Sequence, residues 1–195
     1  MPSFARAAAN AAMIGCALAL ASCSTVTRQE ASSAVVFAQA RDAFEVSGRM
    51  SLRHGSEALA ASFRWHHEAN RDVLDLASPT GQTVARLRGA PGVATLETSD
   101  GHVETAADWT GLAVRSGGWA LPVDGLAFWI QGLPRSGAPF TVEPGTGTNP
   151  GVLRQDGWTI VYLAFAPDAE GAPRPARLSL SYPDVDLRLA IDAWQ

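Results

Sequence analysis

Apolar and polar residues alternate in short runs along most of the chain after residue 44, and this period of two decides the fold class. In "VDLRLAID", residues 185–192, every second residue is apolar, beginning with Val185 and ending with Ile191. Successive side chains of a strand point to opposite faces, so such a run places its apolar residues on one face of a sheet. The alternation predicts a strand that is buried on one side and solvated on the other.

Similar runs recur at regular intervals and are separated by turn sequences such as "SPTG", "GAPG", "SDG" and "QDG". The predicted strands lie at 46–53, 57–67, 72–77, 83–88, 93–98, 140–144, 152–155, 158–165, 178–182 and 185–192. About ten short strands with this spacing predict a mainly β fold, either an antiparallel barrel or a highly curved sheet.

The segment 106–134 breaks the β pattern and predicts two short helices. The first runs from about Ala107 to Arg115 and is stopped by Ser-Gly-Gly. The second follows Pro122, with Asp124 as a candidate N-cap and apolar residues at helical spacing up to Gly-Leu-Pro. A further short amphipathic helix is predicted at 35–44. The central pair is placed to cover one open end of the sheet.

The first 22 residues have the layout of a secretory signal. Arg6 supplies a weakly basic start, and "AAMIGCALALA" is an apolar run of eleven residues that ends in small residues. A membrane-spanning helix needs about 20 apolar residues, so this run predicts a signal peptide, residues 1–22, and no transmembrane anchor.

Leu20-Ala21-Ser22-Cys23 resembles a bacterial lipobox, which predicts that Cys23 becomes the lipidated first residue of the mature chain. The alternative is an ordinary signal peptide with an incidental cysteine. Residues 23–34 are small and polar, as in a tether, and we expect 35–195 to form a single domain. Cys16 lies in the part removed, so the mature chain is expected to have no disulfide.

Charge and motifs exclude several function classes. The formal net charge is −4, and the fifteen basic residues are all Arg without a basic block, so we expect no nucleic-acid partner. The adjacent His66 and His67 would point to opposite faces of a strand and cannot chelate one metal together. The sequence contains no Walker motif and no Gly-x-Ser-x-Gly elbow. We therefore expect no catalytic residues, no metal and no cofactor.

Large apolar side chains are abundant, including six Trp. They can simply fill a core, or a curved sheet with a helical lid can enclose an apolar cavity. Trp194 lies out of phase with the apolar face of its own strand.

Several segments together resemble the LolB family, whose members accept lipoproteins from the periplasmic carrier LolA and insert them into the outer membrane. The resemblance covers almost all of the predicted mature chain. It rests on "SGRMSL", "SFRW", "LASPTG", "LPVDGLAFWIQGLP", "QDGWTIVY" and "LRLAIDAW", with Gly48, Arg49, Phe63, Trp65, Pro79, Gly81, Leu121, Pro122, Leu126, Trp129, Gly132, Pro134, Gly157, Trp158 and Tyr162.

This resemblance implies an unclosed antiparallel β-barrel of about ten or eleven strands, with short helices forming a lid over a hydrophobic cavity. It also implies a lipid-anchored monomer on the periplasmic face of the outer membrane, with a LolA-like carrier and acylated lipoprotein cargo as partners. The candidate acyl-contacting residues are Leu126, Trp129 and Ile130 on the second helix and Phe63, Trp65, Leu74 and Leu76 on strands.

The loop Pro79-Thr80-Gly81 corresponds to the family's membrane-insertion loop and departs from it at one position. Well-known members carry an exposed apolar residue between the Pro and the Gly, where this chain has Thr80. Threonine offers less apolar area to a membrane. Either neighbouring residues assist insertion here or the loop contributes less.

Other functions remain open at this level. A lipid-anchored, lipocalin-like binder of a small apolar ligand is the main alternative, followed by a structural subunit of an outer-membrane assembly and an esterase. Binding of a whole acylated lipoprotein would distinguish the lipoprotein receptor implied by the resemblance from these alternatives.

Overall fold

The computed structural model describes residues 40–116, 121–146 and 149–195. The predicted signal peptide, Cys23 and the tether lie outside the described residues, as does most of the helix predicted at 35–44. At its described end that helix prediction is wrong, because Ala43 begins the first strand and Ala40 to Asp42 are not helical.

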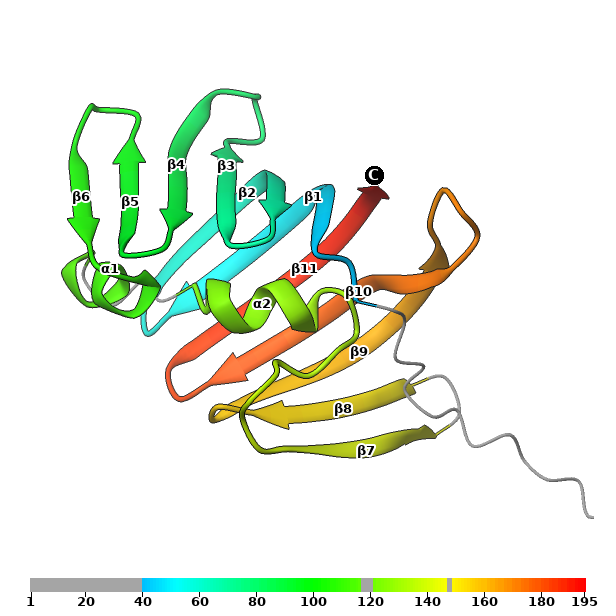
Figure 1. Cartoon of the computed structure of the whole chain (residues 1–195). Coiled ribbons are helices and arrows are strands. Elements are labelled where there is room, and N and C mark those ends of the chain that lie inside the picture. The colour runs from blue at the N-terminus through cyan, green and yellow to red at the C-terminus, as the bar shows by residue number, and fades with distance from the viewer. Residues whose placement is uncertain (1–39, 117–120, 147–148) are drawn as a thin grey trace, which may run out of the picture. The chain divides into compact units, whose positions relative to one another are not determined.

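Eleven antiparallel strands form one curved sheet, in the order β6-β5-β4-β3-β2-β1-β11-β10-β9-β8-β7 (Figure 1). The strands are β1 (Ala43–His54), β2 (Glu57–Glu68), β3 (Arg71–Ala77), β4 (Thr83–Ala90), β5 (Val93–Thr98), β6 (Val103–Ala106), β7 (Phe140–Thr146), β8 (Asn149–Gln155), β9 (Trp158–Pro167), β10 (Pro173–Tyr182) and β11 (Val185–Trp194). Within the described residues β6 and β7 do not pair with each other. The predicted unclosed, mainly β fold is confirmed.

Two short helices, α1 (Trp109–Arg115) and α2 (Val123–Trp129), connect the two edge strands. Figure 1 shows α2 crossing the central strands on the concave side, while α1 lies by the ends of β5 and β6. None of the described helices has the length and apolar character needed to cross a bilayer.

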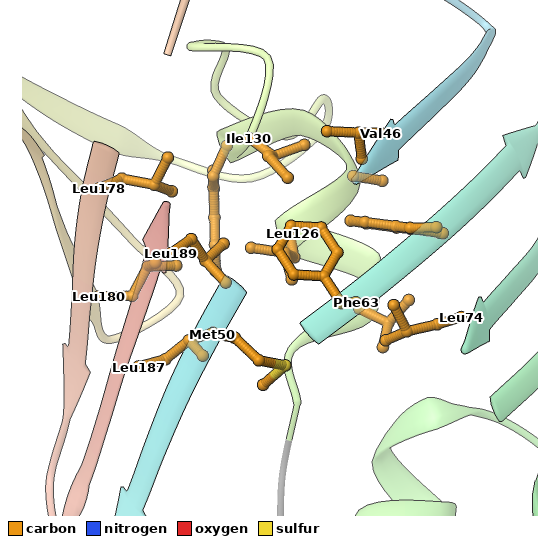
Figure 2. Packing of buried hydrophobic residues seen from close by; sticks show 14 of the residues in the cluster. Val46, Met50, Phe63, Leu74, Leu126, Ile130, Leu178, Leu180, Leu187 and Leu189 are labelled. Carbon is orange, nitrogen blue, oxygen red and sulfur yellow. The ribbon is translucent and has the colours of Figure 1, made fainter. Parts of the chain in front are cut away.

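The core lies between the concave face of the sheet and α2. Inward positions of neighbouring strands meet in register, for example Met50 with Leu189 and Leu52 with Leu187. Figure 2 shows the side chains of Leu126, on α2, and of Ile130, the residue after α2, pointing into this cluster. Burial of such side chains contributes about 1.5–3 kcal/mol each, so the sheet and α2 stabilise one another.

A β-bulge in β11 explains the phase of Trp194. Ser47 pairs with Ala193 but the next residue, Gly48, pairs with Ile191, so Asp192 is an extra residue in the ladder. One inserted residue reverses the alternation, and Trp194 therefore faces the core and is buried. The ladder is tight here, because a Cβ on Gly48 would lie 2.2 Å from the carbonyl oxygen of Ala190.

The two central helices form where the sequence predicts them, but the cap of α2 differs from expectation. Asp108 caps α1, and its side chain accepts a hydrogen bond from Gly111 N at 2.7 Å. The prediction that Asp124 caps α2 is wrong, because the helix already begins at Val123, after Pro122, without a side-chain cap bond. After α2 the chain turns at Gly132, whose φ of 83° suits a residue without a Cβ.

Candidate functional site

An apolar pocket, here the inner pocket, lies between α1 and the strands β1 to β5 and has a volume of about 270 Å³. Except for Thr98 and Ser116 its lining is apolar: Leu52, Leu59, Leu76, Ala85, Leu87, Leu96, Trp109, Leu112, Ala113 and Leu121. The alternation of β1 to β5 aims the strand side chains of this set inward, and α1 and Leu121 supply the others. Such a lining favours hydrocarbon over water.

A larger and more polar space, here the outer cleft, adjoins the inner pocket and has a volume of about 860 Å³. Trp109, Ala113 and Leu121 line both spaces and form the wall between them. The outer cleft also contains Asp124 and the ion pair between Arg135 and Asp156, 2.9 Å apart. The lining of the outer cleft is therefore mostly apolar but, unlike that of the inner pocket, includes charged side chains.

The space directly beneath α2 is filled. A residual void of only about 10 Å³ lies among Met50, Phe63, Trp65, Leu74, Leu121, Leu126, Ile130, Leu187 and Leu189. A water molecule barely fits a void of that size, so this part of the concave face is core.

The predicted acyl-contacting residues fall into three groups in this arrangement. Around the filled space lie Phe63, Trp65, Leu74, Leu126 and Ile130. Leu76 lines the inner pocket and Trp129 lines the outer cleft. Contact of the first group with a ligand stays a prediction, and it requires α2 to move away from the sheet.

Hydrogen bonds fasten the carboxyl-terminal end of α2. The indole N–H of Trp129 donates to Oε1 of Gln155 at 2.9 Å, and the hydroxyl of Tyr162 donates to the carbonyl oxygen of Trp129 at 3.0 Å. Burial raises the pKa of Tyr162, so the hydroxyl keeps its proton and remains a donor.

The amino-terminal end of α2 faces carboxylates instead. Asp72, Asp108 and Asp124, with His67, line a third pocket of about 340 Å³, here the acidic pocket. Partial desolvation and then the negative charge of Asp72 raise the pKa of Asp124, against the opposing charge of Arg135. Hydrogen bonds to the sheet therefore hold the carboxyl-terminal end of α2, whereas its amino-terminal end faces negatively charged groups.

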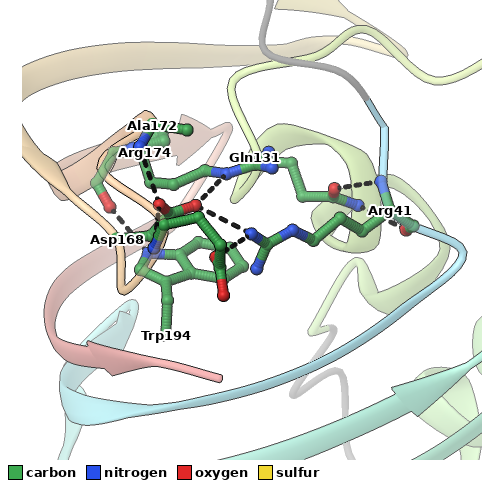
Figure 3. A network of polar contacts seen from close by, with 8 residues as sticks. Arg41, Gln131, Asp168, Ala172, Arg174 and Trp194 are labelled. Atoms are coloured by element: carbon green, nitrogen blue, oxygen red, sulfur yellow. Dashed lines mark hydrogen bonds and ion pairs between the residues drawn. The ribbon is translucent and has the colours of Figure 1, made fainter.

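A buried polar network joins the start of the described chain to α2 (Figure 3). Oε1 of Gln131 accepts a hydrogen bond from the backbone N of Arg41 at 2.8 Å. The buried carboxylate of Asp168 accepts hydrogen bonds from Arg41 at 2.9 Å, Arg174 at 3.2 Å and the backbone N of Ala172 at 2.8 Å. Residue 41 is therefore held between the end of α2 and the β9–β10 hairpin.

Sequence reasoning missed this network and the role of Gln155. The glutamine precedes Asp-Gly and looks like an ordinary turn residue, and the partners of Asp168 are separated from it by up to 127 positions. No periodic signal marks such contacts. Trp109 was also missed, because its apolar helix signal does not reveal that it separates two spaces.

The loop predicted to insert into the membrane forms the turn between β3 and β4. Pro79, Thr80 and Gly81 are all exposed, and Gly81 has a φ of 88°. The hydroxyl of Thr80 lies 2.8 Å from that of Ser78, so its polar group is engaged within the turn. The insertion role of the loop stays a prediction.

The described residues contain no group of three or more His, Cys, Asp or Glu that could hold a metal ion. His66 is exposed, whereas His67 is partly buried with Nδ1 2.7 Å from Asp72. Asp72 also accepts a hydrogen bond from the indole N–H of Trp65 at 2.8 Å, so this carboxylate is engaged in structure.

Several known proteins are similar to most of this chain. Residues 42–194 match the family described as "Outer membrane lipoprotein LolB". An outer-membrane lipoprotein LolB from Thiobacillus denitrificans is 36% identical over 179 residues, which are 92% of this chain and 93% of that protein. A protein of the same name from an Azoarcus species is 34% identical over 176 residues, 90% of this chain and 89% of the relative. A crystal structure of a LolA superfamily protein from Nitrosomonas europaea aligns with 84% of this chain and 90% of that chain, at 10% identity and a TM-score of 0.49.

Proposed function

The chain belongs to the LolB family of outer-membrane lipoproteins, and we propose that it receives acylated lipoproteins from a LolA-like periplasmic carrier and inserts them into the outer membrane. The observation that carries the proposal is the inner pocket, an apolar space of about 270 Å³ that adjoins a larger cleft with charged groups in its lining. Hydrocarbon and head group of an acylated protein need surfaces of these two kinds.

The free energy of hydrocarbon burial explains why such a protein needs a cavity. Each methylene removed from water contributes about 0.8 kcal/mol, so one sixteen-carbon chain contributes on the order of 12 kcal/mol. A lipoprotein with about three such chains cannot cross an aqueous compartment unprotected. Transfer through this protein is downhill, so its cavity binds acyl chains more strongly than the carrier and less strongly than the bilayer.

The inner pocket alone is too small for several chains, and we infer that further space is made when α2 leaves the concave face. Leu126 on its apolar face, and Ile130 directly after it, would then exchange contacts with core residues such as Phe63 for contacts with acyl chains. One apolar contact replaces another, which keeps the free-energy change of opening small. The acyl-contacting role of these residues is part of the proposal.

The anchor belongs to the same proposal. Lipidated Cys23 would hold the protein, as a monomer, on the periplasmic face of the outer membrane, and residues 23–34 would act as its tether. Anchoring raises the effective concentration of the domain at the membrane, so the insertion step becomes local. The exposed turn Pro79-Thr80-Gly81 would meet the bilayer. No catalytic step is required.

A transfer assay tests the function. The mature chain with Cys23→Ala is mixed with carrier loaded with an acylated lipoprotein, and separately with the same lipoprotein lacking its acyl chains. We expect a complex only with the acylated form, detected by native mass spectrometry. Failure to take up the acylated form would contradict the proposal, and occupancy by a fatty-acid-sized molecule alone would favour a binder of small apolar ligands.

A further inference from the structure

The indole N–H groups of the tryptophans differ in whether they have an acceptor. The indole N–H of Trp65 donates to Asp72 at 2.8 Å, and that of Trp129 donates to Gln155 at 2.9 Å. The indole N–H of Trp194 donates to the carbonyl oxygen of Pro175 at 3.4 Å. Within the described residues, the indole N–H groups of the two others, Trp109 and Trp158, have no acceptor. Buried donors are normally satisfied, so these two require an explanation.

Both of these side chains are almost completely buried and both line the outer cleft. Trp109 is 9% exposed and Trp158 is 7% exposed. No fully buried side-chain nitrogen or oxygen lacks a partner in the described part of the chain, so both indole nitrogens reach accessible space. That space is available to a ligand.

Both indole rings are held in place by their neighbours. Trp158 stacks on Tyr182, with ring centroids 5.2 Å apart, and lies 6.1 Å from the ring of Trp129. Trp109 packs over Gly89, where a Cβ would lie 2.2 Å from Cζ2 of the indole. Trp109 also stands where the inner pocket, the outer cleft and the acidic pocket meet. Fixed donors bind an acceptor with little loss of conformational entropy.

The charges of the outer cleft favour a neutral acceptor. The guanidinium of Arg135 is already paired with Asp156, and Asp124 adds a carboxylate to the lining. An anionic ligand such as a fatty-acid carboxylate would find no free cation among these residues and would meet the charge of Asp124. An ester or amide carbonyl accepts a hydrogen bond without carrying charge.

We propose that the outer cleft is a head-group subsite, in which the indole N–H of Trp158 donates a hydrogen bond to the ester or amide carbonyl that heads an acyl chain, with Trp109 as a second donor. The inference rests on the proposed function, because it takes the hydrocarbon to lie in the inner pocket behind the wall formed by Trp109 and Leu121. It adds the chemical group by which acylated cargo is distinguished from bare hydrocarbon.

Two ligands that differ only in the carbonyl group measure its contribution to binding. Monopalmitoylglycerol and hexadecylglycerol ether have the same glycerol head and the same number of carbons in the chain, and only the ester has the carbonyl oxygen. We expect the mature Cys23→Ala chain to bind the ester about three- to tenfold more tightly than the ether, measured by displacement of a fluorescent apolar probe. Trp158→Phe should lower this ratio, with Trp109 as the remaining donor, while leaving affinity for the ether within about twofold.

A spectroscopic measurement reports the hydrogen bond directly. In the ¹⁵N-indole-labelled chain, the ester should shift the indole N–H resonance of Trp158 downfield, and that of Trp109 as well, whereas the ether should leave both nearly unchanged. Trp194→Phe is the matched control, because it removes an indole N–H that already has a protein acceptor; the ratio of ester to ether affinity should not change.

The outcomes separate this inference from the proposed function. Equal affinity of the unsubstituted chain for ester and ether, with equal resonance shifts, would overturn the head-group subsite even if both ligands bind. Binding of neither ligand would overturn the proposed function as well. If Trp158→Phe does not fold, the resonance shifts in the unsubstituted chain still decide. Palmitate at neutral pH should bind more weakly than the ester, and stronger binding would contradict the assignment.

Discussion

The indole N–H of Trp129, the last residue of α2, donates a hydrogen bond to Oε1 of Gln155, the last residue of β8, at 2.9 Å. The same oxygen accepts from the backbone N of Arg135 at 2.7 Å, and Nε2 of Gln155 donates to the carbonyl oxygens of Arg135 and Ala138. One buried amide thus fastens α2 and the segment that follows it to the sheet. Movement of α2 away from the sheet is therefore expected to begin at its other end, by Asp124.

Gln155→Leu should be strongly destabilising. The change leaves the indole N–H and the backbone groups of Arg135 without partners, and each unsatisfied buried group costs about 1–3 kcal/mol. We expect the free energy of unfolding to fall by at least about 3 kcal/mol in urea titrations. Gln82→Leu, at an exposed turn position, is the control and should change it by less than about 0.5 kcal/mol. Equal effects would show that Gln155 does not fasten α2.

Ala85→Phe should reduce acyl-chain binding while the protein stays folded. Ala85 lines the inner pocket, and a phenyl ring there would occupy space needed by hydrocarbon. Exclusion of two methylenes would cost about 1.6 kcal/mol, or roughly tenfold in affinity. Ala60→Phe, on the exposed face of β2, is the matched control. Unchanged affinity of the Ala85→Phe variant for a sixteen-carbon ester would place the hydrocarbon elsewhere.

Gly48→Ala should destabilise the central ladder next to the bulge. The new methyl group would lie 2.2 Å from the carbonyl oxygen of Ala190, which is backbone and cannot rotate away. We expect a loss of about 1–3 kcal/mol in the free energy of unfolding. Ser51→Ala, exposed on the same strand, should have little effect. If Gly48→Ala leaves the free energy of unfolding unchanged, the backbone at the bulge can relax to accept the methyl group.

Asp168→Asn should alter the acid sensitivity of the fold. Burial opposes the charge of Asp168, but the hydrogen bonds from Ala172 and Arg174 and the charge of Arg41 outweigh it and lower its pKa. A lowered pKa in the folded state contributes stability that is complete above the unfolded value, about 4, and is lost as pH falls through the folded value.

Unfolding measured from pH 5 down to pH 2 should therefore show a steeper loss of stability for the unsubstituted chain than for Asp168→Asn. Asp192→Asn is the control, because its ion pair with Arg49 is solvent-exposed and contributes little. Parallel curves for Asp168→Asn and the unsubstituted chain would contradict the assigned role of the network.

Thr80→Leu should accelerate insertion without changing uptake. Thr80 is exposed at the tip of the β3–β4 turn, and leucine would add apolar area that can enter a bilayer. We expect faster delivery of lipoprotein from the loaded protein to vesicles and the same uptake from the carrier. Thr141→Leu, exposed on β7, controls for added surface hydrophobicity. A delivery rate unaffected by Thr80→Leu would mean that this loop does not meet the membrane.

The strands could be predicted because each has its own alternation of apolar and polar residues. A β-bulge that changes which face a residue points to could not be predicted in this way. Asp192 shifts Trp194 to the core through an extra residue in one ladder, and only the partner strand reveals that shift. In the same way, Asp124 is a good cap by residue type, yet α2 begins one residue earlier, after Pro122.

The sequence identifies the inward faces of the helices and strands but not the space between them. Leu126 and Phe63 were predicted to line a cavity, and in the structure they lie around the filled space beneath α2. The inner pocket instead arises where side chains from five strands converge under α1, among them Leu59 and Leu96. Such a volume depends on the curvature of the sheet and on packing distances, which no local pattern encodes.

The missing pairing between β6 and β7 gives this sheet a freedom that a closed barrel lacks. In a closed barrel the number of strands and their stagger fix the internal diameter, so a wider interior requires ladder hydrogen bonds to break. Here β6 and β7, the two edge strands, can move apart while all the strand pairs described between them keep their hydrogen bonds. If the interior holds acyl chains as proposed, its width can therefore follow their number and length without any loss of strand pairing.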